Sequence, residues 1–97
     1  MEFREYRDNS NRLAVSLAQF PSLAYRFVRW KLTRRFKLRK SGSYVKGLDE
    51  KFQKFSCDKG NVTIDWDIWS GFIVTALDAE SEALVREIGD YLKSKYA

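Results

Sequence analysis

The sequence has no histidine, one cysteine and one proline among its 97 residues. Histidine is the residue type most often used as a general acid or base and as a metal ligand. Nucleophilic catalysis through a Ser–His or Cys–His pair is therefore excluded, and so are zinc sites built from paired cysteine and histidine. The lone Cys57 has no partner for an internal disulfide.

Several familiar chemical motifs are missing too. The chain contains neither a glycine-rich phosphate-binding loop nor the Gly-x-Ser-x-Gly elbow of many hydrolases. Its N-terminus has no apolar stretch like that of a secretory signal, and no hydrophobic run is long enough to span a bilayer. We therefore expect a cytoplasmic, non-enzymatic protein that uses no cofactor and no metal.

The composition predicts one folded domain. Hydrophobic residues make up 44% of the chain and aromatic residues 15%, which is too apolar for a disordered protein and enough to fill a small core without disulfides. A chain of 97 residues suffices for one domain and not for two. We assign residues 1–97 to a single domain and expect residues 1–8 to be flexible.

Charge is distributed unevenly along the chain. The formal net charge of +5 divides into 0 for residues 1–21, +9 for residues 22–54 and −4 for residues 55–97. A basic middle and an acidic C-terminal part are the most distinctive property of the sequence. Such an asymmetry bears on association with other molecules rather than on the fold.

The C-terminal half has the clearest pattern. Apolar and polar side chains alternate along residues 61–69, as in a strand with one buried face. A turn at Ser70-Gly71 and a second β-prone run over residues 72–78 complete an antiparallel hairpin. On the first strand Trp66 belongs to the core, and Trp69 points to the outer face.

A helix is predicted after this hairpin. Asp78 has the features of an N-cap, and acidic residues follow in the first turn, where the helix dipole favours them. An apolar stripe with helical spacing comes next and consists of Leu84, Val85, Ile88, Tyr91 and Leu92. The sequence thus predicts a two-layer α+β fold: a small antiparallel sheet built on the 61–69/72–78 hairpin, covered by a C-terminal helix and N-terminal helices.

Helices are also predicted in the N-terminal half. One begins near Asn9 or Ser10, carries apolar residues at 13, 17 and 20 on one side, and ends at Pro21. The spacing of Leu48, Phe52 and Phe55 predicts a short helix after Gly47.

Between these two segments, helix and strand compete. Apolar residues from Val28 to Leu38 alternate with basic ones, as in a strand. Pro21 and the many long straight-chain residues favour a helix from about residue 22 to Thr33, followed by a short strand near residues 36–38.

The segment 26–40 is the most informative for function. It contains eight basic residues interleaved with Phe27, Trp30 and Phe36. Cations neutralise phosphates and exposed rings stack on unpaired bases, so this composition favours a nucleic-acid surface. The candidate phosphate contacts are Arg29, Lys31, Arg34, Arg35, Lys37 and Arg39. The signature motifs of known nucleic-acid-binding modules are absent.

Other interpretations of the segment remain open. The charges could form a solvated face, or the acidic C-terminal part could neutralise them within the monomer. An anionic membrane surface is disfavoured, because the cations scatter around any helix drawn through the segment. The main alternative is a protein-interaction or self-assembly module, in which the basic segment meets an acidic protein or a second copy near Asp67 and Trp69.

Two further sets of residues are candidate sites. Asp65 and Asp67 share one face of a strand, about 7 Å apart, but a hard cation needs more oxygen ligands than two side chains supply. We expect them to solvate the open face of the sheet. Cys57 is expected to be a small buried hydrophobe, although Lys54 and Lys59 lie close enough in sequence to activate a thiol.

Overall fold

The computed structural model describes all 97 residues. Strands and helices alternate irregularly along the chain. In order, the elements are β1 (Phe3–Arg7), β2 (Leu13–Leu17), the 3-10 helix η1 (Ser22–Ala24), α1 (Tyr25–Phe36), β3 (Arg39–Lys40), β4 (Val45–Lys46), β5 (Glu50–Cys57), β6 (Gly60–Asp67), β7 (Gly71–Ala76), the 3-10 helix η2 (Ala79–Ser81) and α2 (Glu82–Tyr96).

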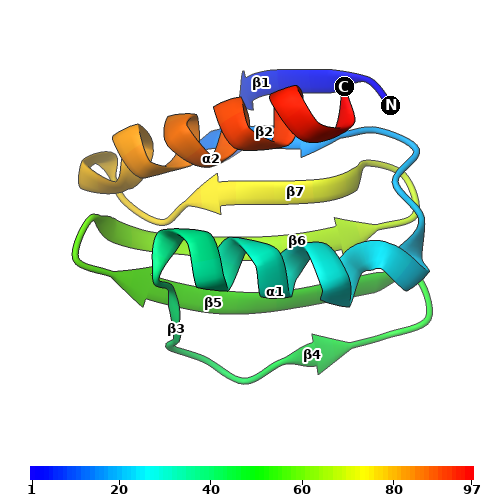
Figure 1. Cartoon of the computed structure of the whole chain (residues 1–97), viewed down its shortest axis with the longest axis horizontal. Helices are drawn as coiled ribbons and strands as arrows, with labels where there is room; N and C mark the ends of the chain where they lie inside the picture. The colour runs from blue at the N-terminus through cyan, green and yellow to red at the C-terminus, as the bar shows by residue number, and fades with distance from the viewer.

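One antiparallel sheet carries both helices on the same face (Figure 1). The strand order is β1-β2-β7-β6-β5-β3, and β4 also pairs with β5. α2 lies over β2 and β7, and α1 lies over β5 and β6, so the opposite face of the sheet has no helix. Neither helix has the length and hydrophobicity that crossing a membrane requires. The predicted α+β architecture is confirmed, with seven strands in the sheet and one α-helix in the N-terminal half.

The predicted hairpin is present as β6 and β7. Trp66 pairs with Phe72, and the alternation along residues 62–66 places their apolar side chains in the core between sheet and helices. Gly71 begins β7 with a φ of 80°, and a Cβ there would lie 2.1 Å from the carbonyl oxygen of Leu17. Glycine is therefore required where the hairpin turns against β2.

The C-terminal helix is confirmed as well. The carboxylate of Asp78 accepts a hydrogen bond from the Ser81 N–H at 2.9 Å and caps η2, from which α2 continues. Hydrogen bonds from the side chains of Ser81 and Asn61 lower the pKa of the Asp78 carboxyl. Gly89 lets α2 approach β2 closely, because a Cβ at this position would lie 2.9 Å from Val15 Cγ1.

The first predicted helix is wrong, because a hairpin of β1 and β2 occupies this part of the chain. The two strands pair from Phe3 with Leu17 to Arg7 with Leu13, so residues 3–7 form a strand. All five residues of β2 are buried, and the strand lies between β1 and β7 and beneath α2. A strand buried on both faces shows no alternation, and its apolar spacing therefore resembled that of a helix.

The helix predicted after Gly47 is also wrong. Residues Glu50–Cys57 form β5, which pairs with β6 over its whole length. Phe52 and Phe55 point to opposite faces of the sheet, since strand residues an odd number apart do so. Phe55 is buried, whereas Leu48 is fully exposed. The helical spacing of these apolar residues therefore had no structural meaning.

The segment in which helix and strand competed is helical. Residues Tyr25, Val28 and Leu32 are buried on the inner face of α1. Lys37 ends the helix in a left-handed conformation, with φ 56° and ψ 44°. The strand predicted near residues 36–38 occurs slightly later as the two-residue β3, and Leu38 enters the core.

Candidate functional site

Two buried hydrogen bonds determine how α1 sits on the sheet. The indole Nε1 of Trp66 donates to the Phe20 carbonyl at 2.7 Å and holds the chain just before η1. The hydroxyl of Tyr25, at the start of α1, donates to the carbonyl of Ile64 in β6. Burial raises the pKa of Tyr25, so its hydroxyl keeps the proton that this bond needs. These contacts decide which side of α1 faces solvent.

The outer face of α1 is both aromatic and basic. Phe27 and Trp30 are 57% and 56% exposed, and their stacked rings have centroids 6.5 Å apart. Lys31 Nζ lies 5.4 Å from the Phe27 centroid, and Arg34 Cζ lies 5.5 Å from the Trp30 centroid. These four residues form a mixed patch of rings and cations, which we call the α1 surface.

Arg29, one of the candidate phosphate contacts, points elsewhere. Its Nη1 donates a hydrogen bond to Gln53 Oε1 at 3.2 Å. Its guanidinium carbon lies 4.5 Å from the centroid of the Tyr44 ring and 5.3 Å from that of Tyr25. Arg29 thus lies between α1 and the sheet and is not part of the α1 surface.

The remaining candidates lie at the C-terminal end of α1. Arg35, Lys37 and Arg39 line a cavity of about 820 Å³ together with Cys57 and Lys59 of the β5–β6 turn. We call this the α1-end cavity. The six candidate phosphate contacts therefore divide into three groups: two on the α1 surface, three at this cavity, and Arg29, which is partly buried between α1 and the sheet.

None of the ion pairs in the structure uses a basic residue of the segment 26–40. The four pairs are Arg4–Glu2, Arg7–Glu82, Lys59–Glu87 and Arg86–Glu5.

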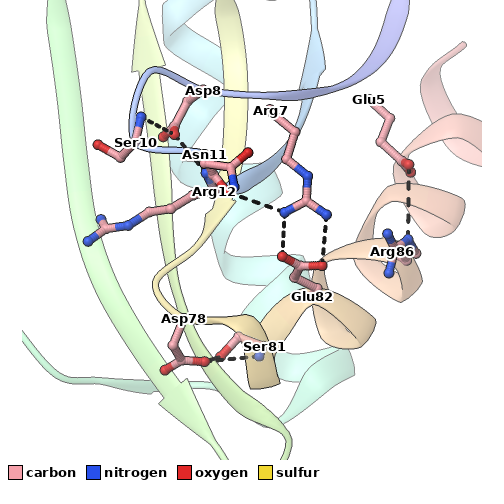
Figure 2. A network of polar contacts seen from close by, with 10 residues as sticks. All are labelled: Glu5, Arg7, Asp8, Ser10, Asn11, Arg12, Asp78, Ser81, Glu82 and Arg86. Atoms are coloured by element: carbon pink, nitrogen blue, oxygen red, sulfur yellow. Dashed lines mark hydrogen bonds and ion pairs between the residues drawn. The ribbon is translucent and has the colours of Figure 1, made fainter.

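Two ion pairs join the C-terminal part of the chain to β1 (Figure 2). Arg7 donates to both carboxylate oxygens of Glu82 at the start of α2, and Glu5 lies 4.0 Å from Arg86. The hydrogen bonds from Arg7 lower the pKa of Glu82. Neither pair involves a cation of segment 26–40.

Asp65 and Asp67 share the sheet face that no helix covers, but their surroundings differ. Asp65 accepts a hydrogen bond from the Thr63 hydroxyl at 3.1 Å, while its Oδ1 is buried without a partner. Burial raises the pKa of Asp65 to about 7. Asp67 accepts the N–H groups of Trp69 and Ser70 and so stabilises the β6–β7 turn. Nowhere do three or more potential metal-ligating side chains come together.

Trp69 lies apart from the α1 surface. Its side chain is 82% exposed at the β6–β7 turn. With Tyr6 of β1 and Ser16 of β2, it lines a second cavity, of about 570 Å³. Tyr6 and Ser16 belong to the sheet face without helices, so the two contact regions suggested by the sequence lie on different sides of the sheet.

The sequence does not reveal that Lys59 lies beside the end of α1 or that Tyr44 lies against Arg29. Lys59 joins the cavity because Arg39 of β3 pairs with Ser56 of β5, which brings the β5–β6 turn beside the end of α1. Tyr44 covers Arg29 from the connection between β3 and β4. Both contacts depend on strand pairing between segments that show no local pattern, so no sequence signal marked them.

Cys57 is half-buried in the wall of the α1-end cavity. Its Sγ accepts a weak hydrogen bond from the Lys59 N–H at 3.4 Å. The thiol is therefore part of a cationic cavity wall and is not enclosed in the core.

No family model matches this chain, and no curated protein or solved structure is significantly similar to it.

Proposed function

We propose that the protein is a non-enzymatic binding module that holds single-stranded nucleic acid against the α1 surface. One observation carries this proposal: the half-exposed rings of Phe27 and Trp30 lie beside two cations without carboxylate partners. Bases stack on exposed rings whatever their sequence, and cations neutralise the phosphates between them. A cytoplasmic location, where single-stranded RNA is available, belongs to the same proposal.

An unpaired strand suits this surface better than a duplex. In a duplex the base faces are hidden in the helical stack, so exposed rings gain little from it. In a single strand every base offers a face, and stacking contributes about 1–3 kcal/mol per base. Lys31 and Arg34 then contact phosphates on either side of the stacked bases. Binding of this kind is weakly sequence-dependent and strongly salt-dependent.

The proposal is tested by titrating a fluorescein-labelled oligo-dT with the protein at several salt concentrations. Anisotropy gives the affinity, and its dependence on salt gives the number of phosphate contacts. We expect Lys31→Gln and Arg34→Gln each to flatten the salt slope by about one unit. The control variant is Arg12→Gln, an exposed cation in the turn between β1 and β2, which leaves the slope unchanged. A wild-type protein that does not bind the oligonucleotide at low salt contradicts the proposal.

Binding to an anionic membrane surface is tested in parallel. Leu23 is 95% exposed one turn before Phe27, and apolar residues flanked by cations also suit a lipid interface. Co-sedimentation with vesicles containing phosphatidylserine distinguishes the two. Vesicle binding without oligonucleotide binding favours a lipid partner over single-stranded nucleic acid.

Protein interaction or self-assembly is the second candidate function. It is favoured by Trp69, because a largely exposed tryptophan is a typical anchor of protein contacts. A sizing column run without nucleic acid at low and high salt tests it. An oligomer that dissociates in Trp69→Ser supports assembly, whereas a salt-independent monomer excludes it.

A further inference from the structure

The α1-end cavity has a volume typical of a small-molecule site. Its volume of about 820 Å³ lies within the range of roughly 300–1,000 Å³ that is usual for ligand pockets. Three parts of the chain form it: the end of α1 with its link to β3, the β5–β6 turn, and Glu87 of α2. The largely buried Leu38 and the half-buried Cys57 supply an apolar part of its wall.

The lining of this cavity is cationic. Its lining residues include four with basic side chains, Arg35, Lys37, Arg39 and Lys59, and two with carboxylates, Asp58 and Glu87. One cation is already neutralised, since Lys59 lies 3.0 Å from Glu87. The other three cations form no ion pair in the structure.

We propose that the α1-end cavity binds a phosphomonoester, and that this group is the terminal phosphate of the strand held on the α1 surface. The second part rests on the proposed function. A phosphomonoester carries a charge of about −1.5 to −2 at neutral pH and three acceptor oxygens. Three unpaired cations match this dianion. They match less well an internal phosphodiester, which has a single charge, or a carboxylate, which has two oxygens.

The position of the cavity relative to the α1 surface fits this assignment. Trp30 and Lys37 are seven residues apart, so they are separated by two helical turns, or about 10 Å along the axis. Arg34 lies between them, one turn beyond Trp30. A strand whose terminal phosphate enters the cavity thus passes Arg34, and its first bases reach the rings.

The site itself is tested by titrating the labelled protein with adenosine 5′-monophosphate and with adenosine, followed by amide NMR. We expect shifts in residues 35–39 and 57–59 with the monophosphate and none with the nucleoside. Equal responses to the two compounds, or no response to the monophosphate, overturn the phosphomonoester site.

The link to the strand is tested with oligo-dT carrying a 5′-phosphate, a 3′-phosphate or hydroxyl groups at both ends. We expect one of the two phosphorylated oligonucleotides to bind about tenfold more tightly than the hydroxyl-ended one, because a charge-assisted contact has about this effect. Equal affinity of all three overturns the terminal-phosphate role while leaving the proposed function standing. If the nucleotide binds and none of the oligonucleotides does, the proposed function fails and the cavity remains a site for free nucleotides.

Two variants test whether the preference for a phosphorylated end comes from the cavity. Arg39→Gln and Lys37→Asn are each expected to abolish this preference, while the hydroxyl-ended oligonucleotide binds as before. Asparagine is chosen at 37 because it tolerates the left-handed backbone there. Lys40→Gln, an exposed neighbour that does not line the cavity, is the matched control and keeps the preference. A preference that survives in both cavity variants contradicts the assignment.

Discussion

The guanidinium carbon of Arg29 lies 4.5 Å from the centroid of the Tyr44 ring. The same side chain donates to Gln53, which is buried in β5 and donates in turn to the Gly42 carbonyl at 3.1 Å. One arginine thereby connects α1 with β5 and with the loop before β4. A cation that composition alone assigns to phosphate binding is in fact part of the packing between helix and sheet.

Replacing Arg29 is therefore expected to affect stability and not binding. Arg29→Met removes a hydrogen bond and a cation–π contact, which lowers the free energy of unfolding by about 1–3 kcal/mol. Urea denaturation measures this loss, and anisotropy with oligo-dT should show unchanged affinity below the unfolding transition. Arg34→Gln has the opposite profile, with normal stability and weaker binding. An Arg29→Met protein of normal stability that binds weakly contradicts this division.

The exposed rings are expected to contribute to binding more than to folding. Phe27→Ala and Trp30→Ala each remove a stacking partner, which weakens oligonucleotide binding about tenfold, while the free energy of unfolding changes by less than about 1 kcal/mol. Trp30→Phe retains a ring and should lose less affinity. Trp69→Ala is the control, because that residue is exposed but lies outside the α1 surface. Unchanged affinity in both alanine variants of α1 argues against stacking.

Asp65 makes stability depend on pH in a defined direction. Burial raises the pKa of this carboxyl from 3.8 to about 7, so the folded protein holds a proton that the unfolded chain releases above pH 4. The stability that protonated Asp65 contributes is therefore lost as the pH rises from about 4 to about 7, and no further loss from this group occurs above that range.

Asp65→Asn removes this titration. The free energy of unfolding of the variant should equal that of wild type near pH 4. At pH 8 it should exceed that of wild type, by at most about 4 kcal/mol. Urea denaturation of both proteins at pH 4, 6 and 8 measures the difference. A stability difference that does not change with pH shows that Asp65 does not cause the dependence.

Gly71 is expected to be irreplaceable for a backbone reason. Its φ of 80° strains any side chain, and a Cβ would overlap the Leu17 carbonyl oxygen. Gly71→Ala should therefore cost at least about 2 kcal/mol in thermal or chemical unfolding. Gly42→Ala is the control, since its added Cβ would meet only side-chain carbons of Lys54, the nearest at 3.4 Å. Equal stability of the two variants contradicts the geometry described at the β6–β7 turn.

Two of the elements that the sequence predicts correctly, β6 and α2, have one buried and one exposed face. β6 alternates, and α2 has a cap and a stripe, because each meets the core on one side only. β2 is buried on both faces, and β5 turns the polar Gln53 toward the core. Both strands consequently lack the period of two, and their apolar residues happen to fall at helical spacing.

The sequence shows the composition of the candidate site but not its geometry. Segment 26–40 is visibly basic and aromatic, and none of its cations forms an ion pair in the structure. The direction of each side chain is not visible, because it depends on where Tyr25 and Trp66 anchor α1 to the sheet. Arg29 and Arg34 are therefore equivalent in the sequence and different in the structure.

The most direct measurement uses the indole N–H signals of the three tryptophans during an oligo-dT titration. Trp30 lies on the α1 surface, Trp66 is buried and bonded to Phe20, and Trp69 is exposed at the β6–β7 turn. An oligonucleotide whose bases stack on the α1 surface should shift the Trp30 signal progressively, and the signals of Trp66 and Trp69 should stay in place. A titration that moves Trp69 while Trp30 remains unchanged, or moves neither, would contradict nucleic-acid binding at the α1 surface.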